Sequence, residues 1–456
     1  MAGIGFELRK ILRRNSLLSL MQAYSFAAVI SSGPWILSIF GILIIGMLNY
    51  AVVVPGQYIV QFQVSVTYLI ACSLILTGIV QLAYTRYTAD RLFEKNLGAI
   101  GASFYGVTLV VTAVSGALCL PCVVFLFPQQ SVLFRLLFLA CFVVLSNIWI
   151  ATIFLSGMKR YGQIVWLYAL GYAITVAVAA LLRGALLEGL MAGFLLGQSC
   201  MLFGMLVMIA RDFPAEQLMN FGFFKRRAMY PSLMLIGLFY NLAVWIDKFM
   251  FWFNPDTSQA IIGPLRASVI YDMPVFLAYL AIIPGMAIFL MRMETDFVED
   301  YDAFYQAVRT GGSLESIERA RNGMVATIRL GIFEIVKVQT LAVLFLLVAG
   351  DTVLGWMGIS TLYLPLLYID VIGAGLQIVL LGLLNVFFYL DKRSIVLRLC
   401  VGFVILNALF TGVSLRLGPA FYGYGFAVAL LCVVLAAFVL LSRKLEMLEY
   451  DTFMLQ

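Results

Sequence analysis

The 456-residue chain has no histidine, and only 11% of its residues are charged. A soluble domain usually carries about 25% charged residues. The missing histidine removes the commonest metal ligand and the usual general base near neutral pH. The low charge leaves too little polar surface to cover soluble domains of this length. We therefore expect no metal site, no cofactor and no catalytic residue, and a chain that is not an enzyme.

Three further absences narrow the function. No G-x-x-x-x-G-K-[ST] phosphate loop is present, so this chain does not hydrolyse ATP by that route. No soluble region approaches the size of a glycosyltransferase, and we expect no nucleic-acid partner. The start of the chain has basic residues but no short apolar core followed by a small-residue cleavage site, so we expect no cleavable signal peptide.

Long apolar stretches dominate the sequence, which is 63% hydrophobic. Stretches that can cross the ~30 Å hydrocarbon layer recur along the chain, and helices satisfy their backbone hydrogen bonds within lipid. The fold class is therefore an all-α polytopic membrane protein with about 12 transmembrane helices. The predicted spans are 23–49, 58–84, 99–127, 131–157, 162–183, 188–210, 229–253, 266–291, 326–350, 361–390, 394–416 and 420–442.

The seven cysteines are spread through these apolar spans, where small buried side chains are the ordinary interpretation. Cys119 and Cys122 form a C-x-x-C near one end of a predicted helix. Packing is favoured for this pair, and a redox or disulfide role is the minority interpretation.

Lysine and arginine are distributed unevenly between the two sides of the predicted spans. One side receives 23 of the 29 residues of these types, counted over the connections and the two ends. Because cytoplasmic connections carry the excess of positive charge, both termini are expected to be cytoplasmic. The lipid bilayer is expected as an obligatory partner.

A basic linker divides the predicted spans into two sets of six. The expected organisation is an amphipathic helix at 1–22, a six-helix lobe at 23–210, a linker at 211–228, a second six-helix lobe at 229–442 with a cytoplasmic hairpin at 292–325, and a tail at 443–456. The hairpin is either a solvated connection lying over the membrane or a docking surface for a cytoplasmic partner. The candidate docking residues in the linker are Lys225, Arg226 and Arg227.

Charges inside predicted spans gather in the second half of the chain. Asp247 and Lys248 stand side by side in the run FYNLAVWIDKFMFWF. At about 1.5 Å per residue, Asp247 lies roughly 27 Å from the cytoplasmic start of its span. We therefore expect the pair near the outer surface and partly hydrated, with Lys248 extending outward.

Four more charges complete the set. Asp272 lies near the outer end of its span, and Asp370 lies deeper with no evident local partner. Glu334 and Lys337 are three residues apart, so a helix would let them pair. Charges within membranes usually face the protein interior or water. All six residues are candidates for a hydrated substrate path, and for each the alternative is a charge that only ties helices together.

Two other features could serve transport. Tyr240 and Trp245 precede Asp247 on the same predicted helix, and such side chains can stack on sugar rings or contact lipid. In the stretch ISSGPWILS, Pro34 removes a helix hydrogen bond and Gly33 eases the bend. These two residues are a candidate hinge, and a fixed packing kink is the alternative.

The opening MAGIGFELRKILRRNSLLSL and the following SSGPW resemble the PelG family, the inner-membrane transporters of bacterial Pel exopolysaccharide systems. The resemblance covers essentially the whole chain. It implies the two-lobed fold of the multidrug/oligosaccharidyl-lipid/polysaccharide (MOP) exporters and transport of a polymer rich in galactosamine and N-acetylgalactosamine. It also implies a complex with a cytoplasmic glycosyltransferase (PelF) and the membrane proteins PelD and PelE, of which PelD senses cyclic-di-GMP.

The sequence leaves two alternatives open beside polysaccharide transport. One is a flippase for lipid-linked oligosaccharides, and the other is a scaffold that assembles a synthase complex and conducts nothing. The energy source is also open. Polymerisation in the cytoplasm could push the polymer through, or a protonatable carboxylate, Glu334 or Asp370, could couple export to the proton gradient. We favour pushing, because Lys337 would hold Glu334 in its charged form.

Overall fold

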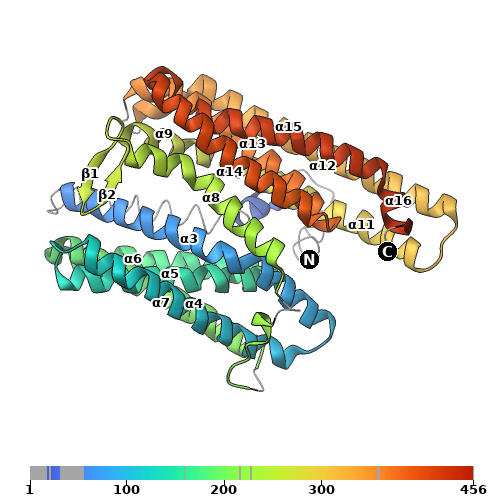
Figure 1. Ribbon diagram of the computed structural model, residues 1–456, viewed down its shortest axis with the longest axis horizontal. Coiled ribbons are helices and arrows are strands. Elements are labelled where there is room, and N and C mark those ends of the chain that lie inside the picture. The colour runs from blue at the N-terminus through green and yellow to red at the C-terminus, as the bar shows by residue number, and fades with distance from the viewer. Residues whose placement is uncertain are drawn as a thin grey trace. The chain divides into compact units, whose positions relative to one another are not determined.

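The computed structural model describes residues 18–19, 22–30, 56–158, 160–214, 217–225, 229–356 and 360–454. The chain separates into two compact units, which Figure 1 shows as bundles of helices. The N-terminal unit comprises Gly33–Trp245 and Trp252–Ser268. The C-terminal unit comprises Met1–Ser32, Ile246–Phe251 and Val269–Gln456. Helix α8 therefore contributes residues to both units.

Among its described residues, the N-terminal unit contains six long helices and a small hairpin. Its elements are α3 (Gly56–Phe93), α4 (Leu97–Leu126), α5 (Val132–Gly157), α6 (Tyr161–Leu181), η1 (Arg183–Ala185), α7 (Leu186–Asp212), η2 (Gly222–Phe224), most of α8 (Pro231–Phe253), and the antiparallel strands β1 (Gln259–Ile262) and β2 (Leu265–Ala267). Helix α5 packs against α3, α4 and α7, and it forms the centre of this unit.

The C-terminal unit is built around α13. Its elements are α9 (Val269–Leu280), α10 (Ile283–Met291), η3 (Arg292–Asp296), α11 (Phe297–Arg309), α12 (Leu314–Trp356), η4 (Thr361–Tyr363), α13 (Leu364–Tyr389), α14 (Arg393–Leu417), η5 (Pro419–Phe421), α15 (Tyr424–Glu446) and α16 (Leu448–Met454). Helix α13 packs against α9, α12 and α15, and α14 packs against α15.

The predicted fold class is confirmed. Among the described residues, eleven helices are long and apolar enough to cross a membrane. Most of their ends agree with the predicted spans to within a few residues, since an uninterrupted apolar run marks such helices directly. The remaining predicted span, 23–49, lies mostly outside the described residues. So do the amphipathic stretch 1–22, apart from 18–19 and 22, and the candidate hinge at Gly33 and Pro34.

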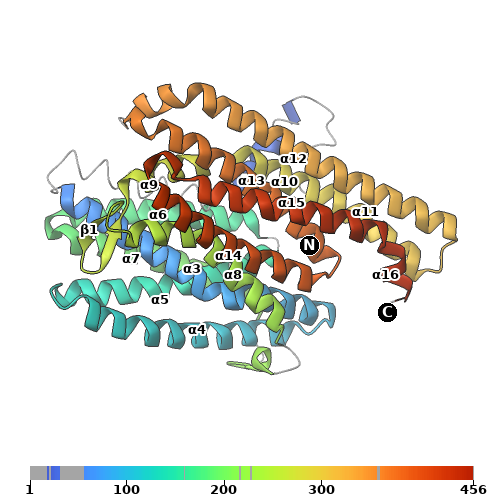
Figure 2. The same cartoon turned by 45° about the horizontal axis from the view of Figure 1, so that its top comes forward.

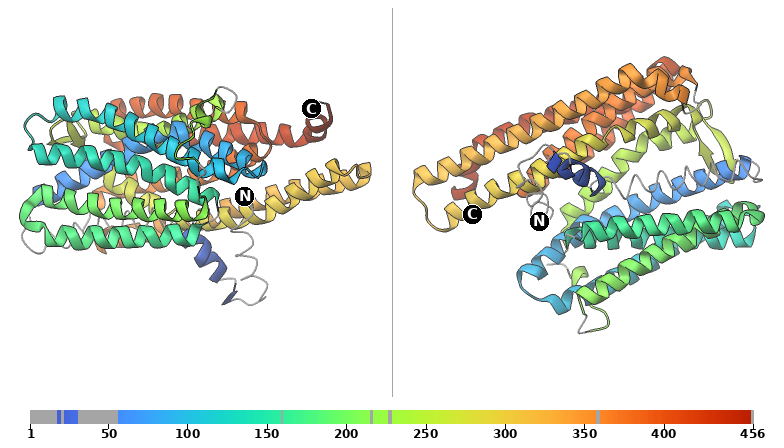
Figure 3. Two further views of the ribbon diagram at one scale, coloured as in Figure 1. Left: turned by 90° about the horizontal axis from the view of Figure 1, so that it is seen from below. Right: turned by 180° about the vertical axis from the view of Figure 1, so that it is seen from behind.

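Two helices, α11 and the start of α12, make up most of the predicted hairpin at 292–325. Helix α12 runs without interruption for 43 residues, which at 1.5 Å per residue is about 65 Å. That length exceeds the ~30 Å hydrocarbon layer about twofold. Figures 2 and 3 show α11 and the first turns of α12 side by side, continuing past the ends of α13 and α14. The break between them is the tight turn at Gly311, whose φ is +68°.

Small residues bring two helices of the N-terminal unit into close contact. Gly193 and Gly197 share one face of α7, and a Cβ at Gly197 would lie 2.4 Å from the backbone oxygen of Gly171 on α6. Thr175 and Ala179 continue the stripe on α6. Without a hydrophobic driving force between helices in lipid, close backbone approach of this kind supplies the packing energy.

The C-terminal unit contains a break between α9 and α10. Pro284 stands in the first turn of α10, where its missing N–H leaves a carbonyl of the preceding turn without its helical donor. Gln339 of α12 donates a 3.0 Å hydrogen bond to the backbone oxygen of Ala281. A neighbouring helix thus supplies a donor to a backbone carbonyl at the break, as intramembrane breaks require.

Candidate functional site

A buried ion pair lies in the part of α8 that belongs to the C-terminal unit. Asp247 is 0% exposed and Lys248 is 5% exposed, and Lys248 Nζ lies 3.0 Å from Asp247 Oδ2. The expectation of a partly hydrated pair with Lys248 extending outward was wrong. Counting residues along a helix gives the depth of a side chain, but neighbouring helices decide whether it meets water.

Side chains from two other helices hold the Asp247 carboxylate. The Tyr271 hydroxyl of α9 donates to Asp247 Oδ2 at 2.6 Å, and Asn407 Nδ2 of α14 donates to Oδ1 at 3.3 Å. The Thr411 hydroxyl donates in turn to Asn407 Oδ1 at 3.0 Å. Phe251 stacks on the Tyr271 ring with 3.8 Å between centroids. A buried carboxylate needs several such donors to offset the loss of water.

Aromatic rings surround the Lys248 ammonium. Its Nζ lies 4.8 Å from the ring centroid of Phe426 on α15 and 5.2 Å from that of Tyr279 on α9. Both distances fall within the ~6 Å over which a cation is attracted to a ring face. The Tyr279 hydroxyl donates to Gln377 Oε1 of α13 at 3.0 Å. The charge on Lys248 is therefore balanced by Asp247 and by the two ring faces.

Asp370 of α13 is the exception in this cluster. It is 2% exposed, and neither of its carboxyl oxygens has a hydrogen-bond partner among the described residues. Lys248 and Asp247 are the charged groups that act on it electrostatically. Most buried polar groups are hydrogen-bonded, so each exception asks for an explanation. Asp370 is the residue of this cluster with unused capacity to accept a proton, a cation or a hydroxyl donor.

The start of α15 lies against Asp370 because the residue there is glycine. Gly423 has φ +83°, a backbone conformation that favours glycine. A Cβ at this position would lie 2.9 Å from Asp370 Oδ1 and 2.6 Å from Leu366 Cδ1. The absence of a side chain at 423 therefore leaves the carboxyl in contact with backbone.

The predicted pair of Glu334 and Lys337 was also wrong. Glu334 of α12 binds Arg292 through two hydrogen bonds, from Nε at 2.6 Å and from Nη2 at 2.9 Å. Arg292 also binds Asp296, and Lys337 is exposed. Arg292 and Asp296 belong to η3, a π-helical segment, and such segments are frequent at functional sites. The fork of a guanidinium matches a carboxylate better than a lysine on the same helix does.

The other predicted site residues are distributed over both units. Tyr240 and Trp245 belong to the N-terminal unit, where Trp245 contacts Trp252 with 6.2 Å between ring centroids. Asp272 is half-buried in the first turn of α9. Lys225 is exposed, and Arg226 and Arg227 lie outside the described residues. Cys119 and Cys122 are free thiols.

Sequence reasoning missed several residues of these networks, among them Tyr271, Tyr279, Arg292, Gln377 and Asn407. A signal was present for some of them. Asn407 and Gln377 are polar residues within apolar spans, and a search limited to charged side chains passes over them. Arg292 follows directly on the predicted end of a span at 291, so its reach back to Glu334 could be seen only once the helix was known to continue.

The comparisons with known proteins decide the family. The profile of the PelG exopolysaccharide exporter family (EPS-E) matches residues 1–453. This chain belongs to the PelG family. The comparison with curated protein sequences gave no match.

Solved structures show the same fold as this PelG family member. A MOP superfamily transporter from Pyrococcus furiosus is similar with a TM-score of 0.65 and 12% identity, over 93% of this chain and 96% of the other. An outward-facing multidrug resistance transporter of the MATE family gives 0.63 and 12%, over 94% and 96%. A point mutant of the MATE transporter VcmN from Vibrio cholerae gives 0.63 and 12%, over 97% and 98%. Family and fold are those of a multi-pass membrane transporter.

Proposed function

We propose that this PelG family member carries a growing exopolysaccharide, rich in galactosamine and N-acetylgalactosamine, across the bacterial inner membrane. The match to the exopolysaccharide exporter family over residues 1–453 carries the proposal. The one-sided distribution of lysine and arginine supports an orientation with both termini in the cytoplasm.

In this proposal the buried cluster of the C-terminal unit has two parts with different roles. Asp247 and Lys248 neutralise each other and hold α8, α9 and α14 together through Tyr271 and Asn407. Asp370 is the working group, because its oxygens make no hydrogen bond within the described structure. Its candidate ligands are a proton and the amino or hydroxyl groups of the sugar.

The contacts of Glu334 bear on the energy source. Arg292 occupies both carboxyl oxygens of Glu334 through two hydrogen bonds, so Glu334 is already committed to a partner within the chain. Asp370 remains as the one proton carrier among the two candidates. Our preferred source of work is still polymerisation by a PelF-like cytoplasmic glycosyltransferase, which pushes the polymer outward.

The extension formed by α11 and the first turns of α12 offers a docking surface for that enzyme. It is exposed and carries both signs of charge, as at Glu315 and Arg319. Separately, the linker offers Lys225, which is exposed, followed in the sequence by Arg226 and Arg227, as a second candidate contact for the enzyme. Mixed charge of this kind favours specific, steered association. PelD-like and PelE-like membrane proteins complete the proposed complex.

Inverted membrane vesicles that contain the whole complex test the proposal. Sugar nucleotide is added outside, and polymer in the lumen is measured with and without a protonophore. We expect lumenal polymer in both conditions, and none when this chain is omitted. If the protonophore abolishes translocation while synthesis continues, the pushing mechanism fails and Asp370 becomes the coupling group. If lumenal polymer forms equally well without this chain, it does not transport the polymer.

A further inference from the structure

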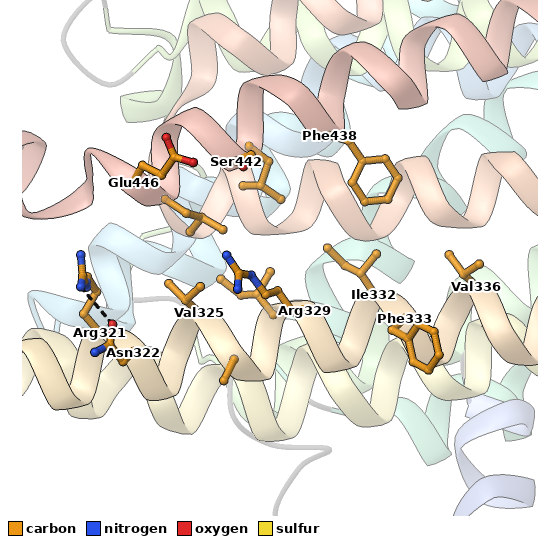
Figure 4. Close-up of a pocket in the computed structure, with 14 residues that line it drawn as sticks. Arg321, Asn322, Val325, Arg329, Ile332, Phe333, Val336, Phe438, Ser442 and Glu446 are labelled. Carbon is orange, nitrogen blue, oxygen red and sulfur yellow. Dashed lines mark hydrogen bonds between the residues drawn. The ribbon is translucent and has the colours of Figure 1, made fainter.

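A groove of about 640 Å³ runs between α12 and α15 within the C-terminal unit. Its α12 wall carries Val325, Ile332 and Val336, and its α15 wall carries Phe438 and Leu441. These positions repeat at three, four or seven residues, so each helix turns one face to the groove. Figure 4 shows Ile332 and Val336 of α12 and Phe438 of α15 pointing into the space between the two helices.

Two opposite charges line this groove without partners. Arg329 extends from α12 towards α15 (Figure 4) and makes no ion pair or hydrogen bond with any described residue. Glu446 of α15 is likewise without an ion pair or hydrogen bond within the described part of the chain. Both side chains belong to exposed residues. Arg321, near Glu446, is already paired with Glu449 of α16.

The groove changes from polar to apolar along its length. Arg321, Asn322 and Glu446 lie at one end, and Phe333, Val336 and Phe438 lie at the other (Figure 4). Ser442 is four residues, about 6 Å along the helix, from Glu446. The polar end lies towards the extension of α12 that exceeds the hydrocarbon thickness, and the apolar end lies towards its membrane span. This order matches a membrane lipid, whose headgroup lies at the interface and whose chains lie in the hydrocarbon layer.

We propose that the groove binds one phosphatidylethanolamine molecule. The Arg329 guanidinium binds the phosphate, because planar donors match phosphate oxygens in a charge-assisted pair. The Glu446 carboxylate binds the ammonium of the headgroup. The acyl chains lie along Phe333, Val336 and Phe438. Basic pockets between transmembrane helices are known sites for lipid headgroups, and a carboxylate beside the arginine distinguishes a zwitterionic lipid from an anionic one.

A transmembrane helix of a partner protein is the other class of occupant for an apolar groove between helices. The groove favours a lipid because its two unpartnered charges have opposite sign and lie at its polar end and middle. A phosphate and an ammonium joined in one headgroup satisfy both. The lipid proposal does not depend on the exopolysaccharide substrate proposed above. With both termini in the cytoplasm, the bound lipid belongs to the cytoplasmic leaflet.

Native mass spectrometry of the purified full chain tests this site. Phosphatidylethanolamine or phosphatidylglycerol with the same acyl chains is added, and the bound lipid is counted. We expect one tightly bound lipid, with phosphatidylethanolamine preferred. Arg329→Gln should weaken binding of both lipids about tenfold, which corresponds to about 1.4 kcal/mol. Glu446→Gln should remove the preference between the two headgroups. Arg319→Gln, at a surface charge paired with Glu315 on its own helix, should leave the binding of both lipids unchanged.

A second measurement guards against variants that fold poorly. Val336→Trp keeps both charges and fills the apolar part of the groove, so it should also displace the lipid. A photo-crosslinking residue at the same position, in native membranes with the whole complex, should label phospholipid. Equal binding of the two lipids by the unmodified chain, an Arg329→Gln variant with normal lipid binding, or a crosslink to a protein instead of lipid would each overturn the proposal.

Discussion

The interiors of the two units solve the problem of buried polar groups differently. In the N-terminal unit the buried polar side chains are uncharged, and several are satisfied by their own helix: the Thr77 hydroxyl donates to the Ser73 backbone oxygen at 2.7 Å. In the C-terminal unit Asp247, Lys248 and Asp370 are buried, and no other charged side chain of the described structure is.

The difference shows that the side chains that are costly to bury belong to the C-terminal unit. A hydroxyl can donate a hydrogen bond to the backbone oxygen one turn earlier in its own helix, and such a bond does not link two helices. A buried charge needs partners from other helices, and the ion pair on α8 takes them from α9 and α14. Such groups are costly and are usually retained for function. We therefore propose that the working residues of this transporter lie in the C-terminal unit.

The largest expected effect comes from breaking the ion pair. Asp247→Asn leaves the Lys248 ammonium buried without its counter-charge, and the loss of one partner of a buried pair costs about 3–5 kcal/mol. We expect a clearly lower thermal unfolding temperature of the purified protein in detergent, together with a low protein level in the membrane.

The matched control for this prediction removes both charges. Asp247→Asn combined with Lys248→Met should recover most of the lost stability, because apolar replacements of a buried pair are often neutral. If Asp247→Asn alone is as stable as the unmodified protein, the ammonium has other sufficient partners. The interior of the C-terminal unit would then depend on its charges no more than that of the N-terminal unit does.

A smaller effect on stability, with a large effect on export, is expected at Asp370. Asp370→Asn removes no hydrogen bond seen in the structure, so stability should change by about 1 kcal/mol or less. Export of the polymer from intact cells should fall at least tenfold if Asp370 is a working group. The measurement is secreted polymer per unit of membrane-inserted protein.

Gln198 provides the comparison in the N-terminal unit. Both of its side-chain polar atoms are buried without partners, yet the side chain is neutral. Gln198→Leu should leave stability and export unchanged or slightly higher. Normal export by Asp370→Asn would show that the charge of Asp370 is not used. A loss of export by Gln198→Leu would show that the N-terminal unit carries working residues as well.

The smallest effect is expected where charges meet water, at the end of the chain. Asp451 of α16 binds Lys392 at 2.7 Å and Lys444 at 3.1 Å. The hydrogen bond from Lys392 lowers the pKa of Asp451 below its ordinary value of 3.8. The contribution is therefore complete above pH 3.8 and is lost as the pH falls through the lowered value. The Asp451 side chain is 5% exposed and its two lysines are partly exposed, and pairs near the surface contribute about 0.5 kcal/mol.

Hydrogen exchange of residues 448–454 measures this contribution. Protection of α16 should be the same at pH 7 and pH 4.5, and Asp451→Asn should reduce it slightly at both. A wild-type loss of protection already at pH 5 would contradict the lowered pKa. A large loss of global stability in Asp451→Asn would contradict the prediction that charges near the surface contribute less to stability than buried charges do.

The apolar runs of the sequence determined the fold class and most of the helix ends, because lipid requires each spanning segment to satisfy its own backbone. The charge pattern also identified Asp370 as a group without a local partner, since one residue and its helix neighbours suffice for that inference. Only the folded unit shows that Asp370 is buried without a hydrogen bond among the described residues, because α15 approaches its carboxyl at Gly423.

The partners of the other charges were decided by tertiary structure alone. Spacing along one helix favoured Lys337 for Glu334, but Arg292 reaches the same carboxylate from another segment with better geometry. Residue counting placed Lys248 near water, but the rings of Tyr279 and Phe426 cover it. Sequence periodicity specifies which residues share a helix face. Which faces meet depends on packing between helices far apart in the chain, and that packing fixes whether a charge is paired, buried or free.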